Sequence, residues 1–138
     1  MLFALCIFAF SCSSDDSDNT SNNTIKGEIY GSSFTAAGGQ AFASGDNLSV
    51  NITNVSADCS LDIINYDLYI TTIVTPEVST NNNAEVFFYA IGESVYELSG
   101  ATVEVVAISD DEITVSISAN SNLSDNNLEG TFTVPICD

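Results

Sequence analysis

The stretch ITVSISANSNLSDNNLEGTFTV, residues 113–134, decides the fold class. Apolar residues stand at every second position from Ile113 to Ile117, and the alternation returns at Leu128, Phe132 and Val134. Because successive side chains of a strand point to opposite faces, this period of two predicts two half-buried strands. The Ser-Asp-Asn-Asn run between them consists of residues that favour turns.

The same signals recur along the preceding part of the chain. Alternation or a short apolar run predicts further strands at residues 25–30, 40–44, 48–53, 66–74, 85–91 and 102–108. Clusters of Gly, Ser, Asp and Asn predict turns at residues 31–33, 37–39, 44–47, 80–83 and 109–111. No stretch combines a helical period with a helix cap. We therefore expect an all-β domain over residues 25–138, folded as a single antiparallel β-sandwich of about eight strands, with a small β-barrel as the alternative.

The sequence is strongly acidic. Of its 138 residues 19 are Asp or Glu, Lys26 is the only Lys or Arg, and there is no His, which gives a formal net charge of −18. Binding to DNA or RNA needs cationic side chains that neutralise phosphates, so nucleic acid is excluded as a partner. The missing His removes the commonest general base near neutral pH and the usual nitrogen ligand of zinc. We therefore expect a protein that is not an enzyme and that holds no cofactor, with bound calcium as the alternative.

Residues 1–11 have the features of a targeting segment. The apolar run at residues 2–10 is much shorter than the roughly 20 residues that span a bilayer, but it fits the apolar region of a signal peptide. It ends in Ala-Phe-Ser directly before Cys12, which resembles the signal peptide of bacterial lipoproteins. The resemblance implies that residues 1–11 are removed and that Cys12 carries a lipid. A buried core segment with incidental thiols is the alternative.

An acidic run follows Cys12 and consists of Ser13, Ser14, Asp15, Asp16, Ser17 and Asp18. It resembles the export signal of surface lipoproteins of Bacteroidota, and this implies an outer-membrane protein that is exposed at the cell surface. A solvated linker is the alternative, and one segment can serve as both. Residues 12–24 are then expected to consist of the lipidated Cys12 and an acidic, disordered tether. Disorder is expected because residues 13–24 contain no apolar side chain that could pack in a core.

Two motifs of the expected domain extend this resemblance. Gly27, Gly31 and Phe34 form a G-x-x-x-G-x-x-F pattern near its start, and GTFTVPIC at residues 130–137 closes it. The chain from Lys26 resembles small β-rich surface lipoproteins of Bacteroidota, a family without an assigned activity. The resemblance implies a fold and a location, and it implies no mechanism.

The expected domain contains only two cysteines, Cys59 and Cys137. An exported protein lies in a compartment that favours disulfides. We therefore predict a disulfide between Cys59 and Cys137, which would tie the last strand to the loop before residue 66. A pair of free thiols is the alternative.

Acidic residues supply the candidates for metal binding and catalysis. Asp110, Asp111 and Glu112 form the densest acidic cluster of the domain and would offer oxygen ligands to calcium. The cluster lacks the spacing of a calcium-binding loop, so a solvated hairpin tip is the favoured alternative. Glycoside hydrolases use paired carboxylates, for which the candidates are Glu85, Glu104 and Glu129. Their alternation with apolar neighbours is typical of outward-facing residues, and the sequence has no Trp to stack on sugar rings.

Aromatic residues supply a candidate interaction surface. Phe87, Tyr89 and Ile91 share one face of a predicted strand, which is either an exposed surface for a glycan or protein partner or simply a second buried face. Burial of both faces is the favoured interpretation. We expect a lipid-anchored cell-envelope protein that acts as a non-enzymatic binding or structural module. The alternative is a calcium-assisted carbohydrate-binding protein or an accessory of a glycoside hydrolase.

Overall fold

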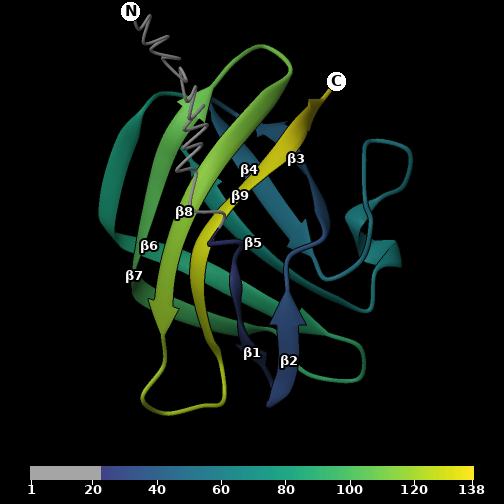
Figure 1. Cartoon of the computed structure of the whole chain (residues 1–138), viewed down its shortest axis with the longest axis vertical. Helices are drawn as coiled ribbons and strands as arrows, with labels where there is room; N and C mark the ends of the chain where they lie inside the picture. The colour runs from purple at the N-terminus through teal and green to yellow at the C-terminus, as the bar shows by residue number, and fades with distance from the viewer. Residues whose placement is uncertain (1–22) are drawn as a thin grey trace, which may run out of the picture.

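The structure is a computed structural model that describes residues 23–138 (Figure 1). Its strands are β1 (Lys26–Ile29), β2 (Ser32–Thr35), β3 (Gly38–Ser44), β4 (Asn47–Thr53), β5 (Leu68–Val74), β6 (Ser79–Ala90), β7 (Tyr96–Ile108), β8 (Glu112–Asn120) and β9 (Asn127–Cys137). One short 3-10 helix, η1 (Ile63–Asn65), lies between β4 and β5. The all-β prediction is confirmed. No helix in the described part of the chain is long and apolar enough to cross a membrane.

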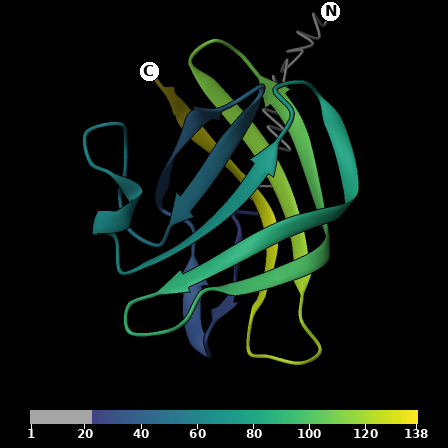
Figure 2. The same ribbon diagram turned by 180° about the vertical axis from the view of Figure 1, so that it is seen from behind.

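The sheet closes on itself. From β3 to β8 each strand pairs antiparallel with the next, and β9 then pairs antiparallel with β8. The last residues of β9 also pair in parallel with β3, at Ala41↔Ile136 and Phe42↔Cys137. This contact completes a closed barrel of 7 strands, β3 to β9 (Figures 1 and 2). The predicted sandwich is therefore wrong, and the alternative of a small barrel is confirmed.

The β1–β2 hairpin extends the sheet beyond the barrel. β1 pairs antiparallel with the first residues of β9, and β3 pairs with the last residues of β9. Both contacts lie on the same edge of β9. β9 thus contacts β1 and β3 along one edge and β8 along the other. The pairing of β9 with both β3 and β8 joins the two ends of the β3–β8 sheet, so no strand from β3 to β9 lies at a free edge of a separate layer.

The predicted strands largely agree with the observed ones, with three corrections to the predicted turns. β3 begins at Gly38, inside the turn predicted at residues 37–39, because Gly38 and Gly39 pair with β4. The turn predicted at residues 31–33 is shorter, and strand β2 begins at Ser32. The turn predicted at residues 80–83 is absent, because β6 runs unbroken from Ser79 to Ala90 beside β7. The structure accordingly has nine strands instead of eight.

The core fills the barrel. The alternating apolar side chains predicted to be buried on β8, Ile113, Val115 and Ile117, are all buried, at 1% exposure or less. They meet inward side chains from the other strands, among them Val50, Ile52, Ile70, Val86, Phe88 and Val103. The interior is therefore a packed core, as expected for a small barrel.

A long loop covers part of the outer surface. Residues 54–67 lie over β3 and β4, where the N–H of Gly39 donates to the carbonyl oxygen of Ala57 at 3.3 Å. A Cβ atom on Gly38 would lie 2.1 Å from the backbone nitrogen of Ala57, so only glycine allows the loop this close. The predicted disulfide is confirmed, because Cys59 of this loop bonds to Cys137 at the end of β9.

Candidate functional site

The barrel wall opens where β5 and β6 diverge. The two strands pair from Leu68↔Ala90 to Thr72↔Val86 and no further. At that point the hydroxyl of Thr72 donates to the carbonyl oxygen of Glu85 at 2.9 Å. The first half of β6, residues 79–85, pairs only with β7. This pairing contains two register shifts, one between Asn81 and Ala84 and one between Ala84 and Glu85. We call this opening the β5–β6 fork.

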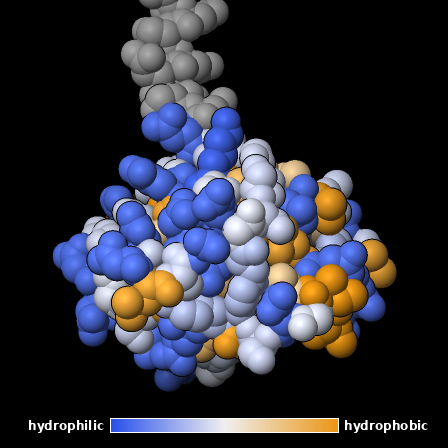
Figure 3. Space-filling model, turned by 90° about the horizontal axis from the view of Figure 1, so that it is seen from below, coloured by the Kyte–Doolittle hydropathy of each residue, from blue (hydrophilic) through white to orange (hydrophobic). Residues whose placement is uncertain are grey.

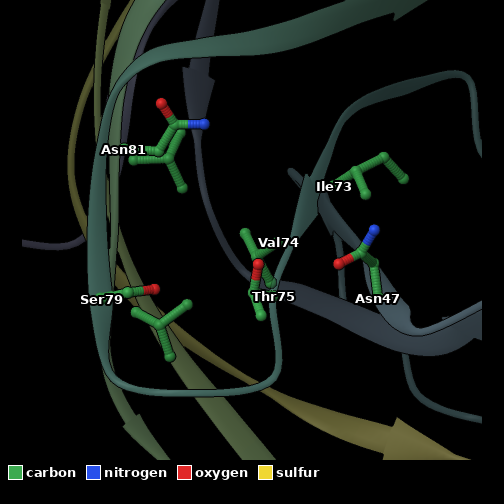
Figure 4. A pocket seen from close by; sticks show the side chains of 8 residues that line it. Asn47, Ile73, Val74, Thr75, Ser79 and Asn81 are labelled. Carbon is green, nitrogen blue, oxygen red and sulfur yellow. The ribbon is translucent and has the colours of Figure 1, made fainter.

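Two adjoining hollows lie in the fork. The larger has a volume of about 240 Å³ and is lined by Asn47, Ile73, Val74, Thr75, Ser79, Asn81, Val103 and Val105 (Figure 4). The smaller, of about 150 Å³, is lined by Ile73, Asn81, Asn83, Ala84, Glu85 and Phe87. Ile73 and Asn81 line both, so the two hollows form one groove.

The groove combines an apolar floor with a polar rim that carries one carboxylate. Val103 and Val105 of β7 are buried at its base, whereas Asn47, Ser79 and Asn81 are exposed. Figure 4 shows Ser79 and Asn81 on one side of the hollow, facing residues of β4 and β5 on the other. Glu85 is the only ionisable side chain among the lining residues. Small-molecule sites combine apolar surface with a few polar groups that fix the orientation of the ligand.

An aromatic strip continues the groove on the outer surface. Phe87 lines the smaller hollow, and Tyr89 points to the same face two residues further along β6. The ring of Tyr89 stacks on that of Tyr69 of β5, with centroids 4.4 Å apart and an interplanar angle of 12°. We call Tyr69, Phe87 and Tyr89 the aromatic strip. Burial, and then the neighbouring Tyr89, raise the pKa of the Tyr69 phenol above its ordinary value, so this ring is neutral near pH 7.

The structure decides between the two interpretations of the aromatic face. Phe88 points into the barrel and is fully buried, whereas the three residues of the strip are only half-buried. Ile91, at the end of the same strand, is 77% exposed. The favoured expectation that both faces are buried is therefore wrong, and the outer face is partly open.

Other exposed apolar residues are scattered. Leu61 and Ile64 lie in the loop over β3 and β4, Ile91 and Val95 flank the β6–β7 turn, and Leu123 lies between β8 and β9. On the face seen in Figure 3, hydrophobic residues form separate patches among hydrophilic ones. Exposed apolar residues that stand singly are common on soluble proteins and do not define a site.

The three glutamates considered for glycoside hydrolysis are not brought together. Glu85, Glu104 and Glu129 are all exposed on the outer surface, on three different strands. The partner of Glu85 on β7 is Ser99, so Glu85 lies about 16 Å from Glu104 along the strand direction. Carboxyl pairs of glycosidases lie roughly 5–9.5 Å apart. Glu129 lies opposite Lys26 of β1, away from the fork.

The acidic cluster of residues 110–112 lies at the exposed β7–β8 turn. The hydroxyl oxygen of Ser109 accepts the N–H of Asp111 at 3.3 Å and that of Glu112 at 3.2 Å. Among residues 23–138, no three or more acidic or cysteine side chains gather as a metal ion would require. The calcium site at Asp110, Asp111 and Glu112 stays the less favoured prediction, and the solvated hairpin tip stays the favoured one.

A thermal melt tests this calcium site. We expect the full chain to unfold at the same midpoint in calcium, in magnesium and in a chelator, since the turn is closed by Ser109 without a metal. A cation that binds the folded state at 100 times its Kd would add about 2.7 kcal/mol of stability. A midpoint raised by calcium alone, and lost in Asp111→Asn, would contradict this expectation.

The predicted lipidation site and export signal cannot be placed in the fold. Cys12, Ser13, Ser14, Asp15, Asp16 and Asp18 all lie outside the described residues. The β5–β6 fork, by contrast, was not predicted from the sequence. The signal that could have revealed it is the run Asn81-Asn82-Asn83, because asparagine is depleted in strands that serve only packing.

The fold and the fork define a small, disulfide-linked β-barrel with a groove in its wall where β5 and β6 diverge. Comparisons of the chain with protein-family models, with curated proteins and with solved structures gave no match.

Proposed function

We propose that the protein is a lipid-anchored cell-envelope protein that acts as a non-enzymatic binding module, with the β5–β6 fork as its ligand site. The observation that carries the proposal is the groove itself, in which amide and hydroxyl groups surround an apolar floor. Such groups orient a ligand through hydrogen bonds. Catalysis needs an activated nucleophile or a paired acid and base. Glu85 is the only carboxylate among the lining residues, and the hydroxyl of Ser79 donates to the backbone carbonyl oxygen of Glu77 at 3.1 Å instead of to a base.

The sequence supports the anchoring part of the proposal. An apolar run of signal-peptide length precedes Cys12, and an acidic, wholly polar segment follows it. A lipid on Cys12 would hold the barrel at the membrane, and the acidic run would direct it to the outer surface of the outer membrane. Electrostatic attraction to anionic lipid cannot replace the lipid, because the net charge is −18.

Labelling with radioactive palmitate tests the anchor. In a bacterium that processes lipoproteins, we expect the full chain to incorporate the label and to fractionate with the outer membrane. Cys12→Ser removes the thiol that carries the lipid and should abolish both, whereas the matched Cys6→Ser should change neither. Equal labelling of the Cys12→Ser variant and the original chain would overturn the proposed anchor.

A binding panel tests the fork as the ligand site. The probes are neutral hexasaccharides, an anionic hexasaccharide of galacturonate, and an extended lysine-containing dodecapeptide, each titrated into the full chain in detergent. We expect at least one probe to bind and Ser79→Trp, which fills the larger hollow, to abolish that binding. Ser32→Trp is the control, because Ser32 is likewise the exposed first residue of a strand but lies on β2, outside the groove. A panel in which nothing binds, or in which Ser79→Trp has no effect, would count against the fork.

A further inference from the structure

We propose that the ligand of the fork is a neutral oligosaccharide. Its ring faces would pack on the aromatic strip, and its hydroxyls would bond to the asparagines of the groove. The inference rests on the proposed function, since it names the class of ligand for that same site. Three independent features of the fork carry it.

The first feature is the set of asparagine side chains. Asn47, Asn81 and Asn83 line the groove and are exposed. The amide oxygen of Asn81 accepts the N–H of Asn83 at 2.9 Å, so the NH₂ group of Asn81 is the donor that this side chain can offer to a ligand. An amide offers both a donor and an acceptor, and a sugar hydroxyl is also both. Side chains of this kind can therefore bond to neighbouring hydroxyls of one sugar ring.

The second feature is the aromatic strip beside these amides. Phe87 lines the smaller hollow together with Asn81 and Asn83, so an aromatic ring and two amides face one space. Tyr69 and Tyr89 extend this surface across to β5, and because their rings stack on each other, each ring keeps one face for a sugar. The C–H faces of a sugar ring are apolar and pack on aromatic faces, while a phenol adds a polar end. Because the two tyrosines hold each other in place, little side-chain freedom is lost on binding.

The third feature is charge. Lys26 is the only cation in the sequence and lies on β1, outside the groove. Glu85 and the net charge of −18 repel anions, which argues against uronic acids and sulfated sugars. A neutral sugar needs no cation, so it fits the groove as it is.

An extended peptide is the competing ligand. Ile73 and Val74 pair only with β4, and residues 79–81 pair only with β7, so both strands present backbone edges to the fork. A peptide that adds to such an edge also needs pockets for alternate side chains. Instead of separate apolar pockets for peptide side chains, the groove presents asparagine side chains, and it continues onto the aromatic strip. These observations favour the sugar.

The experiment is calorimetric titration of the full chain in detergent with hexasaccharides of glucose, xylose and mannose, with galacturonate hexasaccharide, and with the dodecapeptide. We expect a neutral hexasaccharide to bind and the galacturonate to give no signal. Phe87→Ala and Asn81→Ala should each raise Kd about tenfold. Leu123→Ala and Asn120→Ala, matched changes at exposed positions outside the groove, should leave Kd unchanged.

The outcomes separate this inference from the proposed function. Binding of a neutral hexasaccharide that Phe87→Ala and Asn81→Ala weaken supports both. Binding of only the peptide or only the galacturonate, if lost in Ser79→Trp, overturns the sugar and leaves the fork as a ligand site. Sugar binding that no fork variant weakens overturns the inference. The absence of binding by every probe counts against both.

Discussion

Replacing Cys59 and Cys137 together by serine is expected to lower the free energy of unfolding by about 2–5 kcal/mol. The bond spans a sequence separation of 78 residues, and a cross-link over so long a loop strongly restricts the unfolded chain. It also joins the covering loop to the strand that closes the barrel. β3 and β9 meet at only two register pairs, whereas β8 and β9 meet at nine, so the bond lies beside the shortest pairing in the barrel.

Thermal denaturation under non-oxidising and oxidising conditions measures this effect. The midpoint of the double variant should fall by about 10–20 °C, and a reductant should lower the midpoint of the original chain to a similar value. Cys6→Ser provides the control, since Cys6 lies outside the expected domain. Coincident melts for the oxidised chain and the double variant would show that the bond contributes nothing to stability.

The prediction of this bond succeeded for reasons that do not involve geometry. Cys59 and Cys137 are the only cysteines of the domain, and the signal-peptide pattern predicts export to an oxidising compartment. The same kind of reasoning identified the buried faces, because Ile113, Val115 and Ile117 are apolar at every second position. Local pattern and composition were sufficient for both.

The closure of the barrel could not be predicted in this way. A period of two tells which side chains of a strand are buried, but it does not tell which strands pair. The contact that decides between sandwich and barrel joins Ala41 to Ile136 and Phe42 to Cys137, in a parallel pair between distant segments. No local signal in either segment specifies its partner.

The fork was missed for a different reason. Asparagine favours turns, so the run at residues 80–83 was predicted to be a turn. In the structure β7 is long enough to pair with this segment, at Ser79↔Val105, Thr80↔Glu104 and Asn81↔Val103. Pairing with a long neighbour overrides the weak strand propensity of asparagine. The register shifts in the β6–β7 pairing lie beside the opening that we propose as the ligand site.

Phe88→Ala is expected to have the largest effect of any single substitution discussed above, a loss of about 3–5 kcal/mol of stability. Phe88 is 0% exposed and lies opposite Ile70 on β5, with the ring of Tyr96 6.0 Å away on β7. Removing its ring leaves a cavity in the packed interior, which the surrounding strands cannot collapse to fill without breaking the barrel.

The adjacent residue supplies a matched control for this substitution. Phe87→Ala makes the same chemical change one position earlier, on the outer face, where the ring is only half-buried. Denaturant unfolding should show a much smaller loss of stability for Phe87→Ala than for Phe88→Ala, because less apolar area leaves the core. Equal losses would mean that the outer face is packed as tightly as the interior, and the aromatic strip would then be structural. A small loss of stability in Phe87→Ala, together with weaker sugar binding, would show that the two faces of β6 have different roles. The inner face stabilises the barrel, and the outer face binds the ligand.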